Sequence, residues 1–130
     1  MRRRVLIVDD DRDVCLSLQL LLEDRFDVMT ASNGVQALAA VAQQPVDVIV
    51  LDLMMPLMDG AAFKSELDRR GQAIPVVVMS ARADARVQAA GINAAACFVK
   101  PVDPRLLEDA LVDLAERNRP SAVAGEPPSR

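Results

Sequence analysis

The 130-residue chain contains no histidine, no tryptophan and no tyrosine, and only three phenylalanines. Without imidazole, general acid–base catalysis by histidine is excluded, and a zinc site loses one of its usual ligands. Without tryptophan and tyrosine, the chain lacks the large rings that stack on a flavin. Function must therefore rest on carboxylates, hydroxyls and cationic side chains.

Cysteine is also scarce, and long apolar runs are absent. Cys15 and Cys97 are too few for a disulfide framework and lie within apolar segments, so we expect reduced, buried thiols. No apolar run is long enough to cross a bilayer, and the first residues lack the apolar core of a signal peptide. The sequence predicts a soluble cytoplasmic protein with no membrane partner.

Charge and length bound the remaining possibilities. The formal net charge of -4 argues against direct nucleic-acid binding. One folded domain with a hydrophobic core fits the length, and we place it at residues 1–119. Residues 120–130 are rich in Pro, Ser, Ala and Gly, and they predict a disordered tail or linker.

Short apolar runs alternate with stretches of helical periodicity along the chain. The runs predict five strands, at Val5–Val8, Asp27–Ala31, Val46–Leu51, Val76–Met79 and Cys97–Val99. The predicted helices start at Arg12, at Val35, just after Gly60, at Asp84 and at Asp103. Such alternation selects an α/β fold whose parallel sheet is covered by crossover helices.

Polar side chains follow four of the five predicted strands. Asp9 and Asp10 end the first strand, Asp52 the third, Ser80 the fourth and Lys100 the fifth. The carboxyl ends of parallel strands meet at one edge of an open sheet, where ligands bind. Each residue alone could be an ordinary loop residue, but the set predicts a site.

The three carboxylates indicate the chemistry of that site. Carboxylates that converge repel one another and need a cation, and Mg²⁺ prefers such oxygen ligands. A carboxylate beside Mg²⁺ can attack phosphorus and form an aspartyl phosphate. Lys100 can supply the positive charge and Ser80 the hydroxyl that phosphoryl transfer requires.

Four motifs stand directly after the predicted strands. They are Val8-Asp9-Asp10, Asp52 with Met55-Pro56 and Met58-Asp59-Gly60, Ser80-Ala81, and Lys100-Pro101. In this order and at this spacing they resemble the receiver domain of bacterial two-component response regulators of the chemotaxis-regulator-like kind. The resemblance extends from about Val5 to Arg117. It implies a flavodoxin-like, doubly wound, five-stranded sheet in the order 2-1-3-4-5 with five helices.

The resemblance also implies roles for individual residues. Asp52 would accept a phosphoryl group from a histidine of a sensor kinase or phosphotransfer protein. Asp10, Asp52 and the backbone carbonyl of Met54 would ligate Mg²⁺ directly, while Asp9 holds one of its waters. Lys100 would contact the acyl phosphate, and the Lys100-Pro101 bond is expected to be cis. Such a module catalyses its own phosphorylation and dephosphorylation only weakly, and it can dimerise through its fourth helix, fifth strand and fifth helix.

Two positions depart from the family pattern. Cys97 stands where many receivers carry an aromatic ring that reports phosphorylation, and Phe98 should point to the other face of the strand. Asn93 replaces the usual glycine after the fourth helix, where asparagine also tolerates a left-handed backbone. Met54 and Arg82 border the expected site, and we expect them to set the lifetime of the aspartyl phosphate.

Other functions remain open on the sequence. A degenerate receiver would bind partners without phosphorylation, although every residue needed for phosphorylation is present. A small Mg²⁺-dependent phosphohydrolase would use an aspartate after the first strand, but the chain is short and has no cap segment. A flavodoxin would need a phosphate cradle rich in hydroxyls and glycine, whereas the first loop here is acidic.

Overall fold

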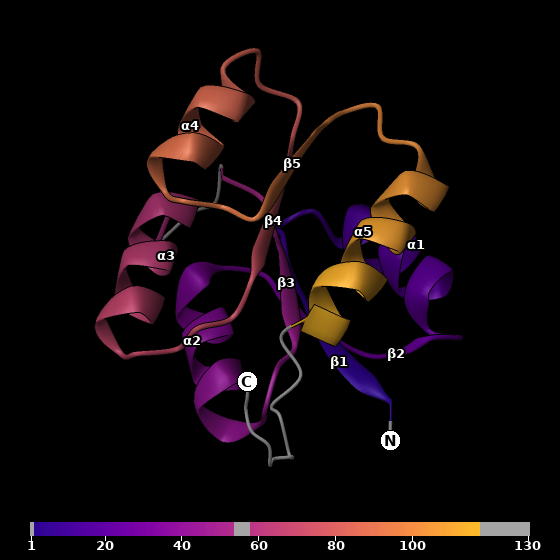
Figure 1. Ribbon diagram of the computed structural model, residues 1–130, viewed down its shortest axis with the longest axis horizontal. Helices are drawn as coiled ribbons and strands as arrows, with labels where there is room; N and C mark the ends of the chain where they lie inside the picture. Colours follow the sequence, from indigo (N-terminus) through magenta and orange to yellow (C-terminus); the bar gives the residue numbers. More distant parts are fainter. Residues whose placement is uncertain (1, 54–57, 118–130) are drawn as a thin grey trace.

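The protein is described by a computed structural model in residues 2–53 and 58–117, where a parallel sheet lies between two layers of helices (Figure 1). The strand order is β2-β1-β3-β4-β5. The strands are β1 (Arg3–Val8), β2 (Phe26–Ala31), β3 (Val48–Leu51), β4 (Val76–Ser80) and β5 (Ala96–Val99). The helices are α1 (Arg12–Leu22), α2 (Gly34–Gln43), α3 (Gly60–Arg69), α4 (Ala85–Gly91) and α5 (Pro104–Arg117).

The alternation of side chains along the central strands divides the core into two sides. Val5 and Ile7 of β1 pack with buried residues of α1 and α5, while Leu6 and Val8 pack with α2 and α3. A third, smaller cluster joins Ala89 of α4 to the sheet. Both faces of the sheet are therefore covered, as the continuous apolar runs of β1 and β3 require.

Side chains at the helix starts fix where three of the helices begin. Asp11, Asn33 and Asp59 each accept a hydrogen bond from a backbone N–H in the first turn of α1, α2 and α3. At the other end of α3, Gly71 has a φ of 73°, a left-handed conformation that glycine adopts without strain. The turns therefore follow local sequence chemistry.

The predicted fold class, strand order and helix count are confirmed. β3 begins at Val48 rather than Val46; just before it, the carboxylate of Asp47 accepts the N–H of Arg4 at 2.7 Å. Asn93 has the expected left-handed φ of 57°, and the Lys100-Pro101 bond is cis.

Both cysteines are free and only partly buried. Within residues 2–53 and 58–117, no helix has the length and apolar character to span a bilayer.

Candidate functional site

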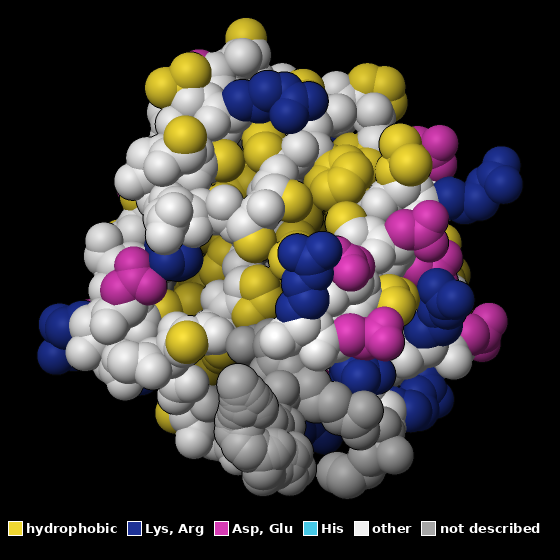
Figure 2. Space-filling model, viewed as in Figure 1, with side chains coloured by type: hydrophobic (Ala, Val, Ile, Leu, Met, Phe, Trp, Pro, Cys, Tyr) yellow, Lys and Arg dark blue, Asp and Glu magenta, His cyan; other side chains and the backbone are white. Residues whose placement is uncertain are grey.

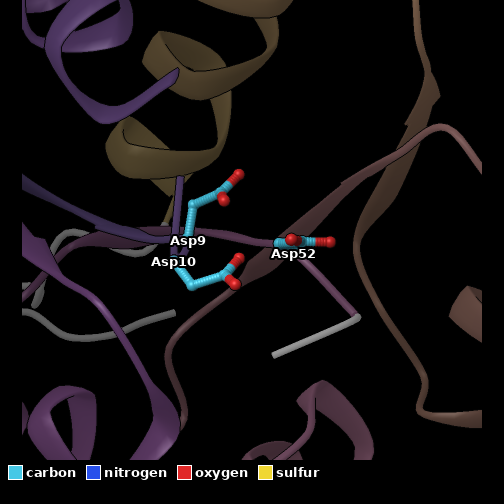
Figure 3. A group of neighbouring side chains, drawn as sticks. All are labelled: Asp9, Asp10 and Asp52. Atoms are coloured by element: carbon cyan, nitrogen blue, oxygen red, sulfur yellow. The ribbon is translucent and has the colours of Figure 1, made fainter. Parts of the chain in front are cut away.

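The register of β1 and β3 brings two aspartates side by side. Val8 pairs with Leu51, so Asp9 and Asp52 are the next residues of neighbouring strands. The N–H of Asp52 donates to the carbonyl of Val8 at 2.9 Å and continues the ladder into the site. Carboxylate oxygens of Asp9, Asp10 and Asp52 all lie within 4.8 Å of one another (Figure 3). The predicted acidic group is thus assembled.

Asp9 lies deepest of the three. The residue is only 4% exposed, and its Oδ1 accepts the N–H of Asp11 at 2.9 Å. Burial raises the pKa of the Asp9 carboxyl to about 6, and the charges of Asp52 and Asp10 add to the rise. The N–H of Asp11 and the charge of Lys100 act in the opposite direction. The negative charge of Asp9 therefore needs further compensation.

A divalent cation fits this donor set. Asp10 is exposed and Asp52 is half-buried, so solvent reaches the group from one side. Carboxylate oxygens with open positions for water are the ligands that Mg²⁺ prefers. Two positive charges in the group would compensate the buried charge of Asp9 and its repulsion by Asp52 and Asp10, which together raise the pKa of Asp9. The expected ligand Met54 lies outside the described residues.

Ser80 and Lys100 reach the same edge from β4 and β5. Ser80 is the last residue of β4 and is buried. The N–H of Lys100 donates to the carbonyl of Ser80 at 2.9 Å, so the two strand ends are joined directly. Because the charge of Lys100 lowers the pKa of Asp9, its ammonium acts on the acidic group. All described site residues predicted from the sequence therefore gather at this edge.

Gly60 allows α3 to start directly against the backbone that follows Asp52. A Cβ at this position would lie 3.0 Å from the Cα of Leu53 and 3.2 Å from the carbonyl oxygen of Asp52. The N–H of Gly60 donates to the carbonyl of Leu53 at 3.2 Å. A larger residue would push the helix away from the strand end that carries Asp52.

Sequence reasoning missed an ion pair in the loop that follows Ser80. The guanidinium of Arg82 donates to both oxygens of the Asp84 carboxylate, at 2.8 and 2.9 Å. A pair two residues apart in a loop carries no periodic signal, so only the geometry reveals it. The thiol of Cys15, which donates to the carbonyl of Asp9 at 3.4 Å, was also missed. Burial and nearby carboxylates raise its pKa, so the thiol stays protonated.

Comparison with protein families agrees with this geometry. The sequence model of the response regulator receiver domain matches residues 5–112. This chain belongs to the response regulator receiver domain family. An acidic group such as Asp9, Asp10 and Asp52 is typical of the receiver magnesium site, and receiver domains partner with histidine kinases.

Several curated response regulators are similar to this receiver. It is 42% identical over 101 residues to the transcriptional regulatory protein PrrA of Mycobacterium tuberculosis, covering 75% of this chain and 43% of that protein. It is 38% identical over 125 residues to the response regulator MprA of Mycobacterium leprae, covering 93% of this chain and 54% of that protein. The chain therefore spans about half the length of the curated relatives it matches.

Solved structures share the fold of this receiver. The receiver domain of the Francisella response regulator 1452 superposes with a TM-score of 0.83 at 26% identity, covering 91% of this chain and all of that one. The chemotaxis protein CheY4 of Vibrio cholerae gives a TM-score of 0.80 at 27% identity, covering 88% and 99% of the two chains.

Proposed function

We propose that this receiver accepts a phosphoryl group on the carboxylate of Asp52 and that phosphorylation switches its interactions with partner proteins. The donor is a phosphohistidine of a sensor histidine kinase or of a phosphotransfer protein. The observation that carries the proposal is the placement of Asp52 at the end of β3, half-buried, with oxygens of Asp9 and Asp10 within 4.8 Å. Neighbouring carboxylates repel one another, so this arrangement is not expected for an aspartate that only begins a loop.

The transfer is a displacement at phosphorus. An oxygen of Asp52 forms the new P–O bond while the P–N bond to the donor histidine breaks, and the released imidazole takes a proton from solvent. Asp52 is the nucleophile, Lys100 pairs with the phosphoryl oxygens, and the Ser80 hydroxyl donates to them. In a separate hydrolysis step, water attacks phosphorus, the P–O bond to Asp52 breaks, and the carboxylate and inorganic phosphate are released while a proton passes to solvent. The domain thus catalyses its own phosphorylation and dephosphorylation weakly and is not a conventional enzyme.

The acidic group holds the metal in this scheme. Asp10 and Asp52 would bind the metal directly together with the carbonyl of Met54, and Asp9 would hold one of its waters. Magnesium supplies positive charge that neutralises the phosphoryl oxygens when it is bound there. Asp9 and Asp10 thus bind and orient, while the covalent step belongs to Asp52.

The remaining features extend the proposal to the whole molecule. The proposal places the receiver at residues 1–119 in the cytoplasm, without direct binding of nucleic acid or membrane. The tail or linker predicted at residues 120–130 lies outside the described residues. A homodimer would form through α4, β5 and α5. In its support, Val87 of α4 is 75% exposed and Leu106 of α5 is 59% exposed, and hydrophobic side chains gather between these helices (Figure 2).

Intact-mass analysis tests the central step. The protein is incubated with acetyl phosphate and Mg²⁺, alongside the Asp52→Asn variant and a sample with the metal chelated. We expect the mass of one phosphoryl group on the wild-type protein, and none on either control. Glu116→Gln, which neutralises an exposed acid at the far end of α5, is the matched control and should gain the group like the wild type.

Other outcomes separate the alternatives. An adduct on Asp9 or Asp10, located by peptide mapping, would favour a phosphohydrolase that uses the first strand end. Absence of any adduct while Mg²⁺ still binds would favour a receiver that only binds partners. In that case Cys97, in place of the usual aromatic ring, is the first residue to examine.

A further inference from the structure

The loop between β4 and α4 ties the site to a helix through three polar residues. The backbone N–H of Arg82 donates to the Oγ of Ser80 at 3.1 Å, which fixes Arg82 beside a buried hydroxyl of the site. The side chain of Arg82 donates two hydrogen bonds to the carboxylate of Asp84. One residue therefore contacts both the site and the start of α4.

Asp84 occupies the position that caps a helix but does not cap it. The corresponding residues of α1, α2 and α3 have extended backbones and accept first-turn N–H groups. Asp84 has φ -97° and ψ 16°, and its side chain makes no capping bond. Its carboxylate is held instead by Arg82 and by the side chain of Gln88, 3.1 Å away. The first turn of α4 is thus left without the cap that its sequence offers.

Helix α4 is short and only weakly anchored, so its first turn can change conformation. The helix has seven residues, and only Ala85 and Ala89 are buried. A helix this short depends on its packing and capping, because isolated short helices are marginal. The Arg82–Asp84 pair is itself part-exposed, at 39% and 46% of the side-chain surface, and such pairs contribute little net stability. Only two small buried side chains therefore anchor the helix, and the ion pair is not buried.

We propose that Arg82 and Asp84 form a charge latch that phosphorylation opens. Without phosphate, Asp84 holds the guanidinium of Arg82. With an aspartyl phosphate at Asp52, Arg82 exchanges the Asp84 carboxylate for the phosphoryl oxygens, and Asp84 turns back to cap the N–H groups of Arg86 and Val87. Asp84 is therefore a positioning residue, and α4 is the element that reports phosphorylation. The inference rests on the proposed function of Asp52.

Charge and geometry favour the exchange. A phosphoryl group carries about -1.5 to -2 charges and three acceptor oxygens, against the single charge of Asp84. A guanidinium matches phosphate oxygens with two parallel hydrogen bonds. A free aspartate at a helix start also accepts first-turn N–H groups readily. The latch gives this receiver a route to α4 that needs no aromatic ring at Cys97.

Amide hydrogen exchange detected by NMR tests the latch in the full chain. Exchange at Arg86 and Val87 is measured with and without beryllofluoride and Mg²⁺, which mimic the aspartyl phosphate. We expect the mimic to slow exchange at these two amides by about fivefold in the wild-type protein, the protection that a helix cap provides.

Four variants distinguish a latch from a structural role. Arg82→Ala frees Asp84, so protection should be present without the mimic and should not increase with it. Asp84→Asn keeps a capping side chain without the charge, and it should behave in the same way. Asp84→Ala should leave both amides unprotected in either state. Arg69→Ala, which removes a cation paired with Glu66 on α3, is the control and should respond like the wild type.

The results separate the latch from the phosphorylation on which it rests. Phosphoryl mass on Asp52 with unchanged exchange at Arg86 and Val87 would overturn the latch alone. Loss of protection in both Asp84 variants alike would also overturn it, because a structural role predicts that pattern. No adduct on Asp52 would instead overturn the proposed function and, with it, the trigger of the latch.

Discussion

The half of the molecule that holds the carboxylates differs in packing from the half that contains α4 and β5. In β1 and β3, Val5–Val8 and Val48–Leu51 are fully buried, whereas every residue of β5 is partly exposed. Helices α1 to α3 are capped by side chains, and α4 is not. The difference separates two tasks, because a site needs fixed geometry and a switch needs an element of low local stability.

Removal of a core ring should give the largest effect and expose the contrast between the halves. Phe63 of α3 is completely buried, so Phe63→Ala should lower the free energy of unfolding by about 3–5 kcal/mol. Phe98 of β5 is partly exposed, so the same truncation there should cost roughly 1–3 kcal/mol. Urea denaturation of both variants measures the difference. Equal losses would contradict the difference in packing between the half that holds the carboxylates and the half that contains α4 and β5.

Removal of the metal should make the free energy of unfolding depend on pH through Asp9, which lies in the half that holds the carboxylates. The pKa of Asp9 is about 6 in the folded protein against 3.8 for an ordinary aspartate, so the folded state binds this proton more strongly. Stability of the metal-free protein should therefore fall as the pH rises from about 4 through 6, by on the order of 2–3 kcal/mol. Urea titrations in a chelator at several pH values measure this fall.

The control for that prediction is Asp9→Asn, which carries no charge at the same place. The variant should lack the fall and should be more stable than the wild type at neutral pH without metal. Addition of Mg²⁺ should stabilise the wild type more than the variant. A fall of the same size in both proteins would assign the pH dependence to other groups.

A smaller effect should follow from adding one methyl group at the start of α2. A Cβ on Gly34 would lie 2.8 Å from both Cβ and Cγ of Met58, so Gly34→Ala should cost about 1–3 kcal/mol. The second change Met58→Ala makes room and should recover part of the loss, which a double-mutant cycle detects. Additive losses in the cycle would show that the two residues are not in contact.

The same change at the end of α4 should have the smallest effect and the opposite sign. A Cβ on Gly91 meets nothing within 4 Å, and its backbone suits an ordinary residue. Gly91→Ala should stabilise the protein by about 0.5–1 kcal/mol, because alanine favours the helix. Thermal unfolding checks the direction. A loss of stability at Gly91 would mean that α4 is more tightly constrained than its exposure indicates.

The order of elements and most of the site could be predicted because their signals are local. Apolar runs that end on Asp9, Asp52 and Ser80 mark buried strands with polar carboxyl ends, and parallel topology then brings those ends together. Cys97 and Phe98 point to opposite faces, as strand alternation required, and they pack in different clusters. The limits of β1 and β3 were less predictable, because Arg4 and Asp47 bond to each other across strands.

By itself the sequence determined the α/β architecture, the family and which carboxylates would meet. Hydrophobic periodicity, turn residues and strand ends depend on residues that are close together in the chain, so they can be recognised from the sequence. The tertiary structure alone decided how deeply Asp9 is buried and hence how far its pKa rises. It also decided that Asp84 turns to Arg82 rather than to its own helix. Burial and the choice of an ionic partner depend on what the whole chain packs around a residue, and no local pattern records that.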